Sequence, residues 1–314
     1  MNRTRIAGAL SALLFLPLAA CGGQSAAEEP AAGEPITVTH TQGETTLDGP
    51  AERIVVLDLG SLDTVRALGA SDNVVGLTKG AALPEPLSEF ADEKYADLGS
   101  VVEPDLEAIA ALDPDLIIAG FRTAALVEEL SKNFPTIDIT FDAEKSFYEG
   151  IEYSTNIIAK AVGAEDEAAE QLAEVEEALA AAQGKTPGGQ TALILMTSGG
   201  KVSAQGTESR YRVLHNELGF EPAISDVDAE AHGDAISFEA IAEANPDVLF
   251  VVDRDAAIGQ EGQAAAQVLD NELMANTTAW SNGDVTYLDG GRWYIMIHGV
   301  DNAVEMLSDA TATN

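Results

Sequence analysis

The sequence has 314 residues, more than a single hydrophobic core usually serves, so we expect two domains. Its 16 basic and 53 acidic residues give a formal net charge of −37 at pH 7. This balance excludes nucleic acid and anionic lipid as electrostatic partners, because both need basic patches on the protein.

The first 21 residues have the layout of a secretory signal. Arg3 and Arg5 precede an apolar run at 7–18, which is too short to span a bilayer in the mature protein. The run ends in Leu-Ala-Ala-Cys at 18–21, which resembles the lipobox of bacterial lipoproteins, where the cysteine is lipidated and becomes the new amino terminus. An ordinary signal peptide that happens to contain a cysteine is the alternative. Cys21 is the sole cysteine of the sequence, so no disulfide can form within one molecule.

Residues 22–35 consist largely of Gly, Ala, Glu, Gln, Ser and Pro. Such a segment cannot bury enough apolar surface to become ordered. We therefore interpret it as a flexible tether that holds the folded protein off the membrane.

The next segment, 36–163, is predicted to form an amino-terminal α/β lobe. Residues alternate between apolar and polar at 36–48 around Gln42-Gly43, which predicts a hairpin. Strands are expected at 54–59, 74–77, 116–119 and 136–139. Helices are expected after a Ser61 cap, from Asp105 through Ile109 to a point before Pro114, and at 124–132 and 147–162, with loop and short helix at 83–91.

A long helix is expected at 165–183, where Ala, Leu, Glu and Gln dominate and Gly and Pro are absent. An acidic coiled-coil strand is the rival interpretation, but the segment holds fewer than three heptads. We interpret 164–189 as a rigid connection to a carboxy-terminal α/β lobe at 190–314. That lobe is predicted to hold strands at 191–196, 201–204, 248–252 and 285–288. Its helices are expected at 209–218, from Ser237 through Ile241 to a point before Pro246, and at about 293–309.

An internal repeat links the two lobes. Residues 105–122 read DLEAIAALDPDLIIAGFR, and 132 positions later residues 237–254 read SFEAIAEANPDVLFVVDR. In each copy an N-cap residue starts a helix, a proline follows the helix, and an apolar run suited to a buried parallel strand comes next. Each copy ends in an arginine, Arg122 or Arg254. Ligands gather beyond the carboxyl ends of parallel strands, so we expect each lobe to offer one arginine to a ligand cleft between the lobes.

Arginine is the informative residue type, because familiar catalytic patterns are missing. The sequence contains no G-x-G-x-x-G, no G-x-S-x-G and no phosphate-loop spacing, and the histidines lack zinc-site spacing. Arg210 lies in Gly-Thr-Glu-Ser-Arg at the start of a predicted helix and joins Arg122 and Arg254 as a candidate for binding anionic oxygen. Surface salt bridges are the alternative role for each of them in so acidic a chain.

Two further residues have side chains that can bind iron. His232 lies in a loop before the second repeat copy, and Tyr294 follows Trp293 just past a predicted strand. Imidazole and phenolate are both ligands for iron, and the aromatic pair could also line a pocket for planar ligand groups. A structural role is the alternative for each residue taken alone.

Together these features resemble periplasmic-binding-protein-type lipoproteins of the iron–siderophore class over nearly all of the mature chain. The shared features are the lipobox, the twin helix–strand units, the connecting helix and Trp293-Tyr294. Within that class, several short motifs resemble the subgroup that binds ferric catecholate and petrobactin-like siderophores: His232-Gly233, Ile236-Ser237-Phe238-Glu239, Asn245-Pro246-Asp247, Val252-Asp253-Arg254 and Trp293-Tyr294. The sequence departs from the subgroup at 296–299, Met-Ile-His-Gly, where a glycine-rich turn is more usual.

The resemblance implies roles for these residues. Arg122, Arg210 and Arg254 would face an anionic ferric complex, with Trp293 beside the ligand. His232 and Tyr294 would complete the iron shell when the siderophore leaves positions open. No intrinsic cofactor is implied, since ferric iron arrives as the siderophore complex, and the protein would be a monomer lipid-anchored on the extracytoplasmic face of the cell membrane.

The resemblance also implies an ABC permease dimer as partner. Glu107 and Glu239 hold the same place in the two repeat copies, at the second helical position. In similar binding proteins such glutamates dock into arginine pockets of a two-fold related permease. The alternative is that each glutamate merely favours the helix dipole, by about 0.3 to 1 kcal/mol.

Three other functions remain open at this point. A protein of the same architecture could bind haem, cobalamin or another chelate. An extracytoplasmic siderophore-processing enzyme would need a nucleophile with a base, and the loops offer no recognisable pair. A purely structural surface lipoprotein would leave the arginines at the strand ends without a role.

Overall fold

The computed structural model describes residues 34–80, 82–142, 144–186, 188–227 and 232–312. The predicted signal with Cys21, and the predicted tether up to residue 33, lie outside these residues. Within the described ranges, no helix combines the length and the apolar character needed to cross a membrane.

The first lobe is built on a parallel sheet. Its strands follow the spatial order β5 (Ala96–Asp97), β4 (Val74–Leu77), β3 (Ile54–Val56), β6 (Leu116–Ala119) and β7 (Thr136–Asp138). The predicted hairpin is confirmed as β1 (Ile36–His40) paired with β2 (Gly43–Leu47). The helices of this part are α1 (Leu59–Ala67), α2 (Leu106–Ala111), α3 (Val127–Leu130) and α4 (Phe147–Val162), with the short 3-10 helices η1 (Ser71–Asn73), η2 (Glu85–Ala91) and η3 (Phe121–Leu126).

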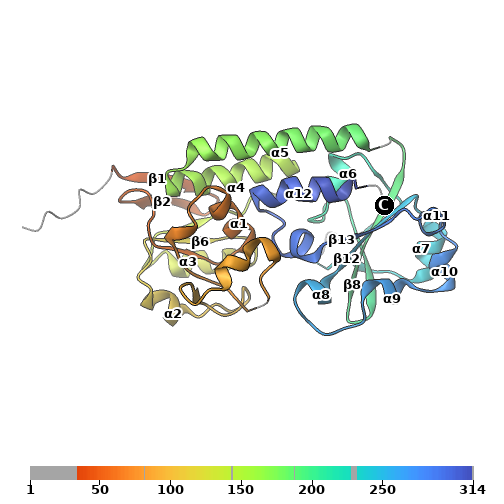
Figure 1. Ribbon diagram of the computed structural model, residues 1–314, viewed down its shortest axis with the longest axis horizontal. Coiled ribbons are helices and arrows are strands. Elements are labelled where there is room, and N and C mark those ends of the chain that lie inside the picture. The colour runs from red at the N-terminus through yellow and green to blue at the C-terminus, as the bar shows by residue number, and fades with distance from the viewer. Residues whose placement is uncertain (1–33, 81, 143, 187, 228–231, 313–314) are drawn as a thin grey trace, which may run out of the picture. The chain divides into compact units, whose positions relative to one another are not determined.

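The second lobe is built on a mixed sheet (Figure 1). Its order is β11 (Asp234–Ala235), β9 (Lys201–Gln205), β8 (Thr191–Ser198), β12 (Val248–Asp253) and β13 (Val285–Leu288), and β10 (Glu221–Pro222) also pairs with β8. The pairs β8–β12 and β12–β13 are parallel, whereas β9 runs antiparallel to β8 and β11. Its helical segments are α6 (Val213–Asn216), α7 (Phe238–Ala244), α8 (Arg254–Ala257), α9 (Ala265–Leu269), α10 (Glu272–Ala275), α11 (Thr278–Asn282), the π-helical turn η4 (Gly291–Ile295) and α12 (Val300–Ala310).

The central strands of both sheets are buried on both faces. In β6, Leu116 and Ile118 join the core on one face of the sheet, while Ile117 and Ala119 join the core on the other. Successive strand residues point to opposite faces, so an unbroken apolar run is what such a strand requires. The predicted α/β class is confirmed.

The repeat copies fold alike. Helices α2 and α7 are capped by the side chains of Asp105 and Ser237, as predicted. In each copy the residue before the proline, Asp113 or Asn245, has a left-handed φ of 47° or 44°. This geometry turns the chain from the helix into the strand.

The aspartate of the Pro-Asp pair in each copy binds backbone N–H groups at the start of the neighbouring strand. The Asp115 carboxylate accepts hydrogen bonds from the backbone N–H groups of Glu52 and Arg53, both at 2.9 Å. In the second copy the Asp247 carboxylate accepts from the Thr191 N–H, also at 2.9 Å. Each aspartate therefore fixes its repeat strand beside a neighbouring strand of the same sheet, β3 or β8.

Helix α5 (Glu165–Lys185) packs against both α4 and α12 and runs alongside both lobes (Figure 1). Its buried residues Ala168, Leu172, Val175 and Ala182 are spaced by four, three and seven residues, so they form one stripe. The long helix predicted between the lobes is present. The exact domain boundaries at 163 and 189 stay a prediction.

Four predicted helices have wrong boundaries. The helix predicted at 124–132 is instead the 3-10 helix η3 followed by the short helix α3 at 127–130. Helix α1 begins at Leu59 rather than at Ser61, because the Asp58 side chain accepts the Ser61 N–H at 2.8 Å and is the N-cap. The helix predicted at 209–218 shrinks to α6, since the Ser209 hydroxyl binds the Tyr211 N–H and holds a turn. The final helix is interrupted after η4 and resumes at α12.

The interruption at Gly299 brings the chain close to α1. A Cβ atom at Gly299 would lie 2.4 Å from an Asp63 carboxylate oxygen. Asp63 is 1% exposed and accepts hydrogen bonds from Arg66 Nη2 and the Asn302 N–H, both at 2.9 Å. Arg66 also pairs with Asp301. This network joins α1 to α12.

We expect Asp63→Ala to lower the free energy of unfolding by about 3 kcal/mol, because the partly buried Arg66 guanidinium and the buried Asn302 N–H lose their acceptor. The matched control is Asp72→Ala, which should change it by less than about 0.5 kcal/mol. Asp72 is 98% exposed at its side chain and meets Lys94 only at 3.9 Å. Urea unfolding followed by circular dichroism compares the two, and equal effects would contradict the assignment.

Candidate functional site

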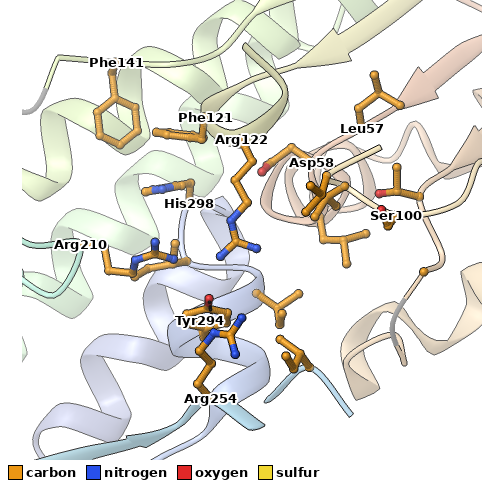
Figure 2. Close-up of a pocket in the computed structure, with 18 of the residues that line it drawn as sticks. Leu57, Asp58, Ser100, Phe121, Arg122, Phe141, Arg210, Arg254, Tyr294 and His298 are labelled. Carbon is orange, nitrogen blue, oxygen red and sulfur yellow. Dashed lines mark hydrogen bonds between the residues drawn. The ribbon is translucent and has the colours of Figure 1, made fainter. Parts of the chain in front are cut away.

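A cavity of about 510 Å³ is lined by residues from both lobes. Leu57, Asp58 and Ser100 come from the loops at the carboxyl edge of the first sheet, and Tyr294 comes from η4 in the second lobe. Figure 2 shows these side chains surrounding one space. The predicted ligand cleft therefore corresponds to a real hollow between the lobes.

The three predicted arginines converge there on one aromatic ring (Figure 2). The guanidinium carbons of Arg122 and Arg210 each lie 5.0 Å from the centre of the Tyr294 ring, and that of Arg254 lies 5.8 Å from it. Arg254 also donates from Nε to the Tyr294 hydroxyl at 3.0 Å. The face of an aromatic ring attracts a cation, so Tyr294 is a shared support for the three charges.

Arg122 reaches the cavity through an unusual backbone turn. The residue before it, Phe121, has a left-handed φ of 48°, which is rare for a bulky side chain and is strained. A hydrogen bond of 2.7 Å from the Phe121 N–H to the Thr140 hydroxyl holds this geometry. The buried Thr123 closes the same turn by accepting from the Gly120 N–H.

Arg254 is fixed by a chain of hydrogen bonds. Its Nη1 donates to the Ser198 hydroxyl at 3.2 Å, and that hydroxyl donates to the Asp255 carboxylate at 3.1 Å. Asp255 is 5% exposed and also accepts the Gly199 N–H. The Ser198-Gly199 turn, which lacks phosphate-loop spacing, thus serves to orient an arginine.

The cations repel one another and have little local compensation. Two unit charges about 10 Å apart repel by roughly 1.7 kcal/mol at an effective dielectric constant of about 20. Among the described residues, the carboxylate within ion-pair distance of this cluster is Asp255, 3.8 Å from Arg254. Burial raises the pKa of Asp58 at the opposite wall, although hydrogen bonds from Ser61 and the charge of Arg122 oppose the shift. The cavity is thus suited to an anion.

Trp293 and Tyr294 have different surroundings. Tyr294 lines the cavity although it is only 3% exposed, whereas Trp293 is fully buried and is not part of the cavity wall. The Trp293 ring lies over that of Tyr211, with centres 6.5 Å apart. Its predicted contact with the ligand is not visible in this geometry and stays a prediction.

His232 is exposed and lies outside the cavity wall. Partial desolvation lowers the pKa of His232, and the charges of Arg254, Arg210 and Arg122 lower it further. The imidazole is therefore within electrostatic reach of all three arginines and is kept neutral, the form that binds metals. In the described part of the chain, no three His, Cys, Asp or Glu side chains are grouped as a metal site.

Sequence reasoning missed part of the cavity wall. Arg212, two residues after Arg210, contributes a fourth guanidinium. Three aromatic rings from distant segments also line the cavity: Phe121, Phe141 and His298. The signals available were the repeated arginine in Arg-Tyr-Arg and the departure from a glycine-rich turn at His298.

The three rings pack as one group at one end of Figure 2. His298 stacks on Phe121 with ring centres 3.7 Å apart, and Phe141 meets each of them edge-on at 5.2 Å. Burial lowers the pKa of His298 to about 3, with further lowering by the charges of Arg210, Arg212 and Arg122. His298 is therefore a neutral aromatic wall at physiological pH.

Glu107 and Glu239 lie away from the cavity wall. Each is exposed and is the second residue of its helix, α2 or α7, as the repeat predicted. No other role of these glutamates is visible in the contacts of the described residues.

Comparison with known proteins shows consistent matches. Residues 54–290 match the profile of a family described as periplasmic binding protein. The chain is 39% identical over 310 residues to the petrobactin-binding protein YclQ of Bacillus subtilis, covering 95% of this chain and 96% of that one. It is 31% identical over 283 residues to the ferric-anguibactin-binding protein FatB of Vibrio anguillarum, covering 88% of this chain and 86% of that one.

Solved structures agree with the sequence matches. The crystal structure of YclQ superposes with a TM-score of 0.84 at 38% identity, covering 89% of this chain and 98% of that one. The periplasmic catecholate-siderophore binding protein VctP of Vibrio cholerae superposes with a TM-score of 0.81 at 33% identity, covering 89% of this chain and all of that one, 100%.

We expect His298 to remain neutral in the folded protein down to a pH of about 3. Because its folded pKa lies below the unfolded value of about 6.5, the stability linked to its neutral form is full above that value and declines as pH falls toward 3. Histidine NMR titration measures the pKa, and Arg122→Gln should raise it by removing one repelling charge. A folded pKa near 6.5 would contradict the buried, arginine-flanked setting.

Proposed function

Because the chain belongs to the periplasmic binding protein family, we propose that it is the extracytoplasmic binding component of an ABC importer. Its ligand in this proposal is a ferric siderophore, with a catecholate-type complex favoured. The observation that carries the proposal is the convergence of Arg122, Arg210 and Arg254 on Tyr294 in a cavity walled by both lobes.

Charge accounts for the chemistry of capture. A ferric catecholate complex is multiply anionic and is repelled by a protein of formal net charge −37 unless cations are focused where it binds. In the partly desolvated cavity, each charge-assisted hydrogen bond from an arginine contributes about 1.5 to 3 kcal/mol. This argument favours a di- or trianionic chelate over cobalamin or haem, which the same architecture could otherwise hold.

Iron itself is cargo in this proposal. A siderophore that supplies fewer than six donor atoms leaves positions open on the metal, and His232 and Tyr294 are the side chains proposed to fill them. The neutral state of His232 and the position of the Tyr294 hydroxyl beside Arg254 support this assignment.

The proposal extends to the membrane side. Cys21 is proposed to carry the lipid anchor, with residues 22–35 as the tether. Glu107 and Glu239, exposed at equivalent places in the two lobes, are proposed to dock one each onto the two subunits of the permease.

Replacing Arg122, Arg210 and Arg254 together by glutamine should weaken binding of a ferric catecholate by several kcal/mol, roughly 4 to 8. The control replaces Lys132, Lys160 and Lys185 by glutamine, which removes the same charge from exposed positions outside the cavity. Calorimetric titration compares the two. Equal affinity of the arginine variant and the wild type would rule out the proposed site.

Tyr294→Phe should abolish a phenolate-to-iron charge-transfer band that appears when the protein binds a tetradentate ferric complex. A hexadentate complex of the same charge is the control, because its full iron shell leaves no position for Tyr294, and its spectrum should be the same in both proteins. Lowering the pH should remove the His232 contribution only below the usual histidine range, since the pKa of His232 is lowered. An unchanged tetradentate spectrum in the variant would exclude direct ligation.

The double variant Glu107→Gln with Glu239→Gln should bind ligand normally and impair cellular uptake. Its matched control is Glu128→Gln with Glu243→Gln, which removes two exposed acids from α3 and α7. Uptake of a radioactive ferric siderophore, at equal surface abundance, separates docking from binding. Normal uptake by the first variant would leave only the helix-dipole role.

A further inference from the structure

One end of the cavity is not needed for holding the iron centre. It is walled by Phe121, Phe141, His298 and Arg212, whereas the three arginines proposed to face the iron complex gather over Tyr294. The aromatic group stands beside that cluster in Figure 2. A ligand that fills the cavity therefore presents a second part of its surface to this end.

Arg212 lies at this end and forms no salt bridge with another described residue. Its guanidinium carbon is 5.9 Å from the centre of the Phe141 ring, so it takes Phe141 as its aromatic support and not Tyr294. Its Nε is buried without a hydrogen-bond partner among the described residues. Buried donors are nearly always satisfied in native proteins, so such an exception calls for a specific explanation.

Glu217, whose carboxylate interacts with the charge of Arg212, does not supply that explanation. Burial raises the pKa of Glu217, and the Phe147 N–H and the charge of Arg212 act against the shift. The Glu217 carboxylate accepts the Phe147 N–H, and no salt bridge within 4.0 Å joins it to Arg212 in the described structure. Arg212 is thus attracted to Glu217 from a distance and keeps donors for another partner.

His298 is not that partner, because its neutral ring carries no negative charge to pair with Arg212. It also carries no positive charge that would compete with Arg212 for an anion. Its ring stacks on Phe121 at 3.7 Å and is neutral at physiological pH. It forms an uncharged aromatic surface beside a free guanidinium. A flat arene that carries a carboxylate matches both features, because the arene can pack against the rings while the carboxylate pairs with the planar fork of arginine.

We propose that Arg212, with the rings of Phe141 and His298, forms a second anion subsite that selects ligands carrying a carboxylate not bound to iron. This inference rests on the proposed function, since it assigns the specificity of the same cavity. Arg212 is then a specificity-determining residue: Arg122, Arg210 and Arg254 recognise the charge of the iron centre, and Arg212 recognises a charge on the periphery of the ligand.

The test uses the ferric complexes of two catechol ligands, which differ in one group per ligand. 3,4-Dihydroxybenzoate and 3,4-dihydroxybenzamide bind iron through the same two oxygens, but only the first carries a free carboxylate. We expect the wild type to bind the ferric benzoate complex about tenfold more tightly than the ferric benzamide complex, as one charge-assisted pair provides. Arg212→Gln should abolish this preference, because it weakens binding of the benzoate complex about tenfold more than binding of the benzamide complex.

Arg122→Gln is the control that tests whether the loss of any positive charge in the cavity, and not of Arg212 in particular, changes the preference for the carboxylate. It removes the same charge near the iron centre, so it should weaken both complexes and keep their affinity ratio near the wild-type value. Arg212→Lys retains the charge without the planar fork and should keep part of the preference, which also controls for any folding defect of Arg212→Gln.

The outcomes distinguish the two claims. If the wild type binds both complexes but Arg212→Gln and Arg122→Gln alter the ratio equally, Arg212 contributes only to the general field and the second subsite is wrong, while the proposed function stands. If the wild type shows no preference, the subsite is likewise wrong. If the wild type binds neither complex nor any ferric siderophore, the proposed function fails together with this inference.

Discussion

Three guanidinium groups meet over one tyrosine ring in a protein whose formal net charge is −37. This concentration of positive charge is unfavourable in the empty cavity, because the cations repel and only Asp255 pairs closely with one of them among the described residues. The scaffold maintains it through interactions that do not neutralise it, namely the Tyr294 ring, the Ser198 hydroxyl and the strained turn at Phe121. An anionic ligand relieves the repulsion between the arginines. The same concentration of positive charge therefore attracts the ligand to the cavity and holds it there.

The internal repeat explains how the charges reach one place. Each copy runs from a capped helix through a left-handed residue and an aspartate-anchored turn into a buried strand, and an arginine follows the strand. Parallel strands present their carboxyl ends at one edge, where ligands of α/β proteins bind. The copies then diverge, since Arg122 depends on a strained turn whereas Arg254 depends on Ser198 and Tyr294. The two lobes thus share the helix–turn–strand unit and differ in the residues that hold the arginine after it.

The sequence predicted well those helices and strands that depend mainly on interactions between residues close together in the chain. Helix α4 spans Phe147–Val162 as expected, and the strands β4, β6 and β13 match the apolar runs. Two helix boundaries were wrong because of local side-chain hydrogen bonds, those of Asp58 and Ser209. Another was wrong because a distant contact overrides propensity: the final helix breaks at Gly299, which the buried Asp63 network of α1 requires. The repeat identified Arg122 and Arg254, but Arg212, Phe141 and His298 meet only after folding, and no local pattern brings them together.

The central claim is that this cavity selects multiply anionic ferric complexes. It is tested most directly by quenching of Trp280 and Trp293 fluorescence in the wild-type protein, titrated with a ferric catecholate, a neutral ferric hydroxamate, haem and cobalamin. The account predicts that the ferric catecholate binds most tightly and that its affinity falls as salt rises, because charge provides the attraction. Tighter binding of the neutral hydroxamate, haem or cobalamin, or a catecholate affinity that does not depend on salt, would contradict it.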